Sequence, residues 1–417
     1  MKDIHGYSKR LDQALARVAK SSAIGEQDKQ LIERFSVVLR AQRISTGRVA
    51  KYVCHLKTIA DTLPTVTRSE RGLIGATKDD IERLGIWINE SEKYRPHTKS
   101  DFATVLKRFY QWVKAPPEEY NSWRKKHRYP SEVDDLNSGM KASQRFLPSD
   151  LLTEDEVNSM IQAAGWTMVK GAVALVDEIG PRPGEFLNMK VKDVMFAEDS
   201  RVICRLAHNG GGKTGERLIL MIKSVPLVAA WLNAHPFRSD PEAPLWVGFS
   251  STNRYEQWSY RAFKNMLSDL GKKAGMNKTV MPYLFRHSAA TRDARLGFTE
   301  AQLCMKYGWV LGSKMPRVYL HMSNTDLYEK IEEAYGGRPS KPREPQTLTC
   351  SRCKRTNHPS QRLCGWCGSP LHEEDMAKQS IELEESAQRD NSKIRVLEEQ
   401  LGKMQEKLTA LLERGQE

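Results

Sequence analysis

A stretch between residues 281 and 322 contains the side chains best suited to chemistry. Arg286, His287 and Arg292 lie within seven positions, and Tyr319 follows on a short basic segment. A phenol can act as a nucleophile, and the planar arginine fork pairs two phosphate oxygens while it stays charged. We therefore expect Tyr319 to attack a DNA phosphate that the upstream cations bind.

Cleavage of a phosphodiester also needs further cations and an acid for the departing oxygen. Arg182 lies at a Pro- and Gly-containing break before a helix, where backbone N–H groups also favour anions. Residues 201–221 form two apolar runs around a Gly-rich turn, which predicts a β-hairpin. Lys213 lies at or just after that turn, from which it could reach a DNA groove and protonate a leaving 5′-oxygen.

The order and spacing of these residues resemble the catalytic signature of the tyrosine recombinases, the integrase family. The pattern is G-x-R-x-x-E, then a hairpin lysine, then x-x-x-R-H, then G-W and a final tyrosine, within residues 152–335. The resemblance implies that Arg182 and Arg286 bind the phosphate. It also implies that Glu185 orients their surroundings and that Lys213 is the general acid.

The end of the signature carries the nucleophile and one departure from the family. Trp309 falls where the family has His or Trp, which implies packing near the nucleophile or an indole N–H bond to the phosphate. Tyr319 falls at the nucleophile position, which implies a 3′-phosphotyrosyl bond without ATP or a catalytic metal. Tyr283 occupies the catalytic histidine position of H-x-x-R, and its phenol is a poor proton shuttle at neutral pH. His287 follows Arg286 directly, so we expect it to point elsewhere on the helix in a structural role.

Two C-x-x-C pairs near the C-terminus offer four thiolates: Cys350, Cys353, Cys364 and Cys367. In a reducing compartment this arrangement points to zinc before disulfides, and it resembles a zinc ribbon. Closed coordination by four thiolates leaves no position for water, so the zinc is expected to be structural. Whether the ribbon contacts DNA or protein stays open.

Composition favours a polyanionic partner. The 417 residues carry a net charge of +13 and a pI near 9.3, so double-stranded DNA is the first partner to expect. The resemblance adds a homo-oligomer on DNA, a tetrameric synapse. The sequence has no signal peptide and no apolar run of membrane-spanning length, so we expect a cytoplasmic, nucleoid-associated protein with no membrane partner.

Periodicity predicts a mainly α fold with a small antiparallel sheet. The expected order is a helical domain resembling the family's core-binding domain, a basic linker, a mixed α/β catalytic domain, a Pro-rich linker, a zinc ribbon and a C-terminal helix with a short heptad seam. Their ranges are 1–115, 116–148, 149–337, 338–349, 350–371 and 376–415. The seam indicates a coiled coil, although a single docked helix remains open.

Two other functions are compatible with this pattern. A type IB topoisomerase would relax DNA by the same chemistry without pairing two sites. A non-catalytic DNA-binding protein on a recombinase scaffold would account for Tyr283 in place of histidine. A site-specific recombinase, an integrase or resolvase, is the leading interpretation.

Overall fold

The computed structural model describes residues 3–68, 71–138, 148–197, 201–206, 215–249, 251, 254–320, 331–332, 335, 347–372, 374–375 and 377. It divides into two compact units, residues 1–145 and 146–417. The described part is mostly helical with a small antiparallel sheet, as the sequence predicted. No helix in these ranges combines the length and apolarity that crossing a bilayer requires.

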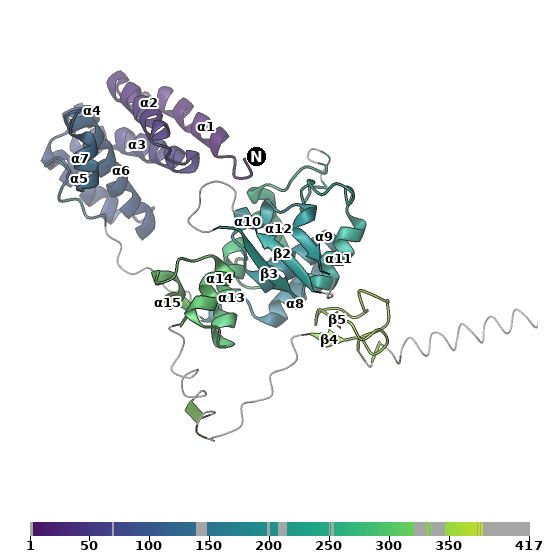
Figure 1. The fold of residues 1–417 in the computed structure, drawn as a ribbon. Helices are drawn as coiled ribbons and strands as arrows, with labels where there is room; N and C mark the ends of the chain where they lie inside the picture. Colours follow the sequence, from purple (N-terminus) through teal and green to yellow (C-terminus); the bar gives the residue numbers. More distant parts are fainter. Residues whose placement is uncertain are drawn as a thin grey trace, which may run out of the picture. The chain divides into compact units, whose positions relative to one another are not determined.

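The first unit is a bundle of helices around one long central helix (Figure 1). Its helices are α1 (Tyr7–Ala19), α2 (Glu26–Ala41), α3 (Thr46–Thr67), α4 (Gly72–Gly75), α5 (Lys78–Glu90), α6 (Pro96–Lys114) and α7 (Tyr120–Lys125). Helix α3 packs against α1, α2, α5 and α6. Its apolar face, spaced at three and four residues, is fully buried with Phe35 and Phe109.

The segment expected to be a linker, 116–148, instead folds against the first unit over its described part. Helix α7 lies within it, and Val133 is fully buried in the helical core. The side-chain amide of Gln111 donates to the carbonyls of Trp123 and Arg128. Tyr129 and Leu136 also pack against this core, and Lys78 pairs with Asp135. These contacts are scattered along a polar stretch and do not produce the apolar periodicity that predicts a core helix.

The second unit surrounds α9, whose residues are almost all buried. The helices here are α8 (Glu154–Ala163), α9 (Thr167–Ile179), α10 (Pro183–Leu187), α11 (Val225–Ala234), α12 (Tyr260–Lys273), α13 (Pro282–Arg295), α14 (Glu300–Tyr307) and α15 (Lys314–Leu320), with the 3₁₀ turns Pro148–Asp150 and Val191–Asp193. Helix α9 packs against α8, α11 and α13. Thr153 and Glu156 form a capping box at the start of α8.

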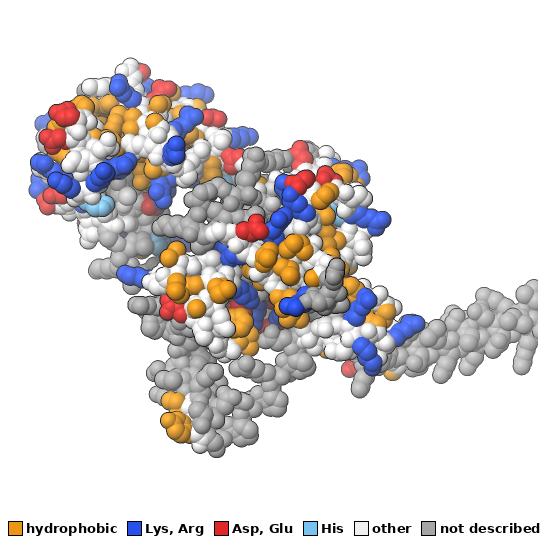
Figure 2. Space-filling model, in the orientation of Figure 1, with side chains coloured by type: hydrophobic (Ala, Val, Ile, Leu, Met, Phe, Trp, Pro, Cys, Tyr) orange, Lys and Arg blue, Asp and Glu red, His pale blue; other side chains and the backbone are white. Residues whose placement is uncertain are grey.

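Three antiparallel strands form the sheet, in the order β1 (Val194–Phe196), β2 (Val202–Leu206) and β3 (Arg217–Met221). Pairing from Val202 with Met221 to Leu206 with Arg217 confirms the predicted hairpin, while its turn lies outside the described residues. Alternate residues of β3, beginning with Arg217, are buried, whereas Leu218 and Leu220 are exposed. Figure 2 shows hydrophobic side chains gathered over this part of the second unit.

Two short strands, β4 (Leu348–Thr349) and β5 (Thr356–Asn357), pair antiparallel beside the four cysteines. Most of the Pro-rich segment 338–349 precedes the described part of this region. The expected C-terminal helix, 376–415, lies outside the described residues apart from residue 377.

Candidate active site

Two helix ends meet where the upstream arginines lie. Helix α9 ends at Gly180 and α14 ends at Gly308, and both glycines have left-handed backbone, with φ of 54° and 60°. The last carbonyls of a helix have no partner inside it, and they carry the negative end of the helix dipole. Guanidinium groups can donate hydrogen bonds to such carbonyls. Arg182 and Arg286 do so here.

Arg182 lies at the N-cap of the short helix α10, where Pro183 fixes the first turn. Its Nη2 donates to the carbonyl of Gly308 at 2.8 Å, and its Nη1 donates to Glu185 Oε1 at 2.8 Å. Its side chain is 31% exposed. Arg182 is therefore fixed by protein acceptors and is still partly open to solvent, where an external anion could reach it.

Glu185 accepts from a second arginine that the sequence reasoning missed. Arg217, on the buried face of β3, donates from Nη2 to Glu185 Oε2 at 2.7 Å and from Nη1 to Oε1 at 3.2 Å. Burial alone would raise the pKa of Glu185, but the hydrogen bonds and charge of Arg217, followed by those of Arg182, lower it to about 2. The carboxylate is charged at neutral pH, and the three side chains together carry one net positive charge.

Gly308 lies directly against the buried side chain of Arg217. A Cβ atom built on Gly308 would lie 2.0 Å from Arg217 Nη1, well inside van der Waals contact. The backbone there also has a positive φ, which side-chain-bearing residues adopt only with strain. Glycine is thus required at this position both by its backbone and by the buried arginine.

Arg286, on α13, is almost completely buried, at 4% exposure. It donates from Nη1 to the carbonyl of Gly180 at 2.9 Å and from Nη2 to that of Tyr307 at 2.5 Å. Its guanidinium lies over the rings of Tyr307 and Trp309, 5.2 and 5.4 Å from their centroids. Burial, followed by the charge of Arg182, lowers the pKa of Arg286 to about 10. It remains a cation at neutral pH, with N–H groups beyond the two already in use.

Tyr319, on α15, lies against the same aromatic group. Its ring stacks on that of Trp309 with centroids 5.1 Å apart and planes within 7° of parallel, and Trp309 in turn stacks on Tyr307. The phenol is 4% exposed. Burial raises the pKa of Tyr319 to about 12, although the charge of Arg286 acts in the opposite direction.

His287 contacts the phenol, contrary to the expectation that it points elsewhere. Its Nδ1 lies 2.6 Å from Tyr319 Oη. Neighbours on one helix do point about 100° apart, but α15 packs against α13 and brings Tyr319 to the face that His287 occupies. Burial, followed by the charge of Arg286, lowers the pKa of His287.

Two sequence candidates are not among the described residues of this constellation. Lys213 falls in segment 207–214, outside the described residues. Tyr283 is on α13 with 49% of its surface exposed. The described site therefore brings together five of the seven expected side chains, which are Arg182, Glu185, Arg286, Trp309 and Tyr319, and adds Arg217 and His287.

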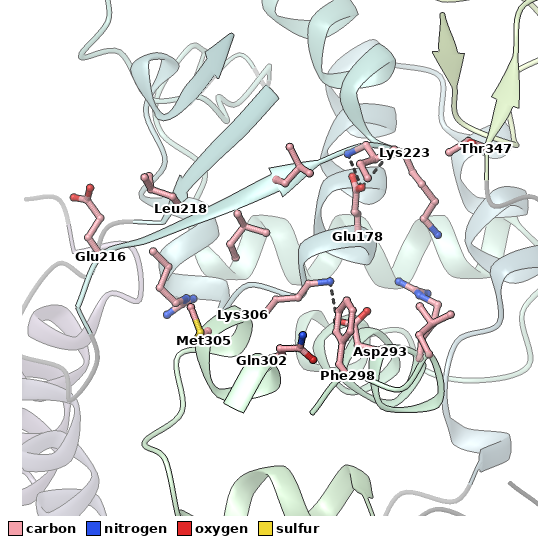
Figure 3. Close-up of a pocket in the computed structure, with 16 residues that line it drawn as sticks. Glu178, Glu216, Leu218, Lys223, Asp293, Phe298, Gln302, Met305, Lys306 and Thr347 are labelled. Atoms are coloured by element: carbon pink, nitrogen blue, oxygen red, sulfur yellow. Dashed lines mark hydrogen bonds and ion pairs between the residues drawn. The ribbon is translucent and has the colours of Figure 1, made fainter. Parts of the chain in front are cut away.

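A cavity of about 850 Å³ lies beside the site, between β3 and helices α13 and α14 (Figure 3). Leu218 on the strand and Phe298 and Met305 on the helical side line it, and the ion pair of Lys306 with Asp293 crosses its wall. Among the described residues that line this cavity is Arg217, but Tyr319 is not. The cavity is therefore not the place where Tyr319 would react.

The four cysteine Sγ atoms form a compact cluster, all within 4.8 Å of one another. The pairs Cys350–Cys367 and Cys353–Cys364 are each separated by 3.6 Å, far beyond a disulfide bond. Four thiolates at about 2.3 Å from a tetrahedral zinc would lie roughly 3.8 Å apart. The donor set and its spacing therefore fit a four-thiolate zinc site.

Comparison with known proteins places this geometry in context. The profile described as the phage integrase family matches residues 150–326. Tyrosine recombinase XerA of Pyrococcus horikoshii is 29% identical over 192 residues, 46% of this chain and 62% of XerA, so the match spans less than two thirds of that protein. A tyrosine recombinase of Thermosipho africanus is 23% identical over 304 residues, 67% of this chain and 98% of that protein.

One solved structure has a similar fold. The Tn1549 transposon integrase in complex with transposon right end DNA is 17% identical, and the match covers 73% of this chain and 99% of that one, with a TM-score of 0.51.

Proposed function

Because residues 150–326 match the profile of the phage integrase family, we propose that this chain is a site-specific DNA recombinase that cuts and rejoins strands through Tyr319. The observation that carries the proposal is the stack of Tyr319 on Trp309 beside the buried cation Arg286. These groups come from three separate elements of the second unit. A phenol and a fixed guanidinium that share one aromatic neighbour suit attack on a phosphate diester, which needs an oriented nucleophile and a cation for the developing charge.

In the proposed reaction, Tyr319 Oη attacks phosphorus, the Oη–P bond forms and the P–O5′ bond breaks. Arg182 and Arg286 bind the non-bridging oxygens as negative charge develops on them. Glu185 holds Arg182 in place, and its own charge is balanced by Arg217. Trp309 fixes the plane of the attacking ring. Because the bond energy is kept in the phosphotyrosyl ester, a 5′-hydroxyl can reverse the step without ATP.

The leaving oxygen also needs a proton, which we assign to Lys213, in the segment 207–214 that connects β2 and β3 in the sequence. The assignment is supported by the antiparallel pairing of β2 with β3 on either side of this segment. Tyr283, at the family's histidine position, is assigned a hydrogen-bonding role because a phenol exchanges protons poorly near neutral pH.

The remaining parts of the chain are proposed to assemble and hold the recombinase on DNA. Double-stranded DNA is the substrate, and the net charge of +13 supports it. The chain acts as a homo-oligomer, a tetrameric synapse, with the helix at 376–415 as a coiled-coil contact. Four cysteines bind a structural zinc in a ribbon that is too small for a core of its own.

The test uses a nicked duplex that carries the cognate site, because loss of the short strand traps the covalent intermediate. We expect the wild-type chain to form a 3′-phosphotyrosyl adduct and Tyr319→Phe to form none while its DNA affinity stays unchanged. If no adduct appears on specifically bound sites, the chain is a DNA-binding protein on a recombinase scaffold. Strand exchange between two defined duplexes distinguishes a recombinase from a type IB topoisomerase, which would only relax supercoiled DNA.

A further inference from the structure

The attack by Tyr319 releases a phenol proton, which a base must accept. The position at which the family usually has a histidine does not supply an imidazole here. Position 283 holds a tyrosine, whose side chain is half exposed. One helical turn later on α13, position 287 holds a histidine. Residues four apart lie on the same face of a helix. The chain therefore carries an imidazole on the expected face of α13, displaced by one turn.

The contact of His287 with the nucleophile is direct. Its Nδ1 lies 2.6 Å from Tyr319 Oη, and the two rings have centroids 5.8 Å apart, tilted by 31°. The phenol cannot swing away easily because its ring stacks on Trp309. The distance lies within the range in which a general base acts on a hydroxyl.

We propose, resting on the function proposed above, that His287 is the catalytic residue that accepts the proton of Tyr319. The proton passes from Oη to Nδ1 as the Oη–P bond forms. The P–O5′ electron pair leaves with the 5′-oxygen, which takes its proton from Lys213. In rejoining, the 5′-hydroxyl returns its proton to Lys213 as it attacks, and the imidazolium returns its proton to Oη as the Oη–P bond breaks.

The surroundings of His287 suit a base better than an acid. Arg286, from its own helix, and Tyr319, from α15, both lie beside His287. Burial and the neighbouring cation both disfavour the imidazolium, so the free protein holds a neutral ring. The phenol is neutral as well. The proton consequently moves only when phosphorus takes up the phenolate charge.

The experiment measures single-turnover adduct formation by the full chain on the nicked duplex. His287→Asn keeps an oxygen acceptor near Nδ1 but removes the base, and His287→Phe keeps the ring shape without nitrogen. His235→Asn is the matched control, because His235 is a buried histidine of the same unit that bonds Pro244 and Phe237 instead of the site. A second substrate carries sulfur at the bridging 5′ position, where the thiolate leaves without protonation.

We expect both His287 variants to bind DNA normally and to form adduct 10²- to 10⁴-fold more slowly, the range for general-base loss. His235→Asn should stay near the wild-type rate. The sulfur substrate should restore Lys213→Ala but not His287→Asn. The wild-type rate should fall as pH drops through the pKa of His287, below 6.5, and His287→Asn should lack that fall.

Three results would overturn the assignment. His287→Asn within threefold of the wild type would show that the base lies elsewhere. Recovery of His287→Asn on the sulfur substrate would place His287 at the leaving group. A parallel loss of DNA binding would make it a structural residue. Absence of any adduct from the wild-type chain is a separate outcome, because it would refute the proposed function itself.

Discussion

Replacement of Arg217 by methionine should strongly destabilise the second unit, because it breaks the buried ion pair with Glu185. Methionine fills much of the same volume, so the change removes the charge without leaving a large cavity. The carboxylate of Glu185 then keeps Arg182 as its ionic partner among the contacts described above. Breaking a buried ion pair from one side typically costs 3–5 kcal/mol because the other charge stays behind.

The pKa of Glu185 gives an independent magnitude. A carboxyl with a pKa of about 2 in place of 4.5 contributes about 3 kcal/mol to folding stability at neutral pH. Because the folded pKa is the lower one, this contribution is present above pH 4.5 and is lost as pH falls towards 2. We therefore expect Arg217→Met to lower the free energy of unfolding by about 3 kcal/mol at pH 7, and by much less at pH 3.

The assay is urea denaturation of the full chain, followed by hydrogen exchange in peptides from α9 and α13. These peptides report on the second unit alone. Glu185→Gln and the double variant complete a cycle, which should show a coupling of about 1–3 kcal/mol. The reasoning fails if Arg217→Met costs under about 1 kcal/mol at pH 7, or if its cost is equal at pH 7 and pH 3.

Three further predictions concern other parts of the chain. Gly308→Ala should cost about 1–2 kcal/mol through its left-handed backbone and slow adduct formation by displacing Arg217; an unchanged rate would separate this contact from catalysis. Chelation of zinc, or Cys367→Ser, should raise hydrogen exchange in residues 348–372 but not in α9, whereas unaltered exchange would mean that the thiolates hold no ion. Removal of residues 376–417 should reduce oligomer size in sedimentation, and an unchanged size would favour a docked helix over a coiled coil.

Local signals in the sequence predicted the fold class, whereas the expected site residues followed from the order and spacing of the tyrosine recombinase signature. The Pro- and Gly-containing break before a helix indicated Arg182. The Gly-rich turn between two apolar runs predicted the hairpin of β2 and β3. Arg217 was missed, although a signal existed. In the run Arg217 to Met221, every second residue faces inward, which places an arginine at a buried position that demands a charged partner.

His287 was misjudged for a different reason. The helical argument was correct for α13 alone, but the angle at which α15 returns over α13 is a tertiary property that no spacing encodes. The same holds for residues 116–138, where the buried Val133 and a few scattered contacts join a polar segment to the first unit. Contacts made by one residue from outside a periodic pattern remain invisible until the chain is folded.

The arginines of the site are held by main-chain oxygens at the ends of α9 and α14. Every residue has a carbonyl, so this part of the clamp depends on where each helix stops. One residue inserted into α14 would rotate its last carbonyls by about 100° and remove the Gly308 acceptor of Arg182 and the Tyr307 acceptor of Arg286. We therefore expect insertions and deletions not to be tolerated in α14 or at Gly308. They should be tolerated in the loop that leads from Trp309 to α15.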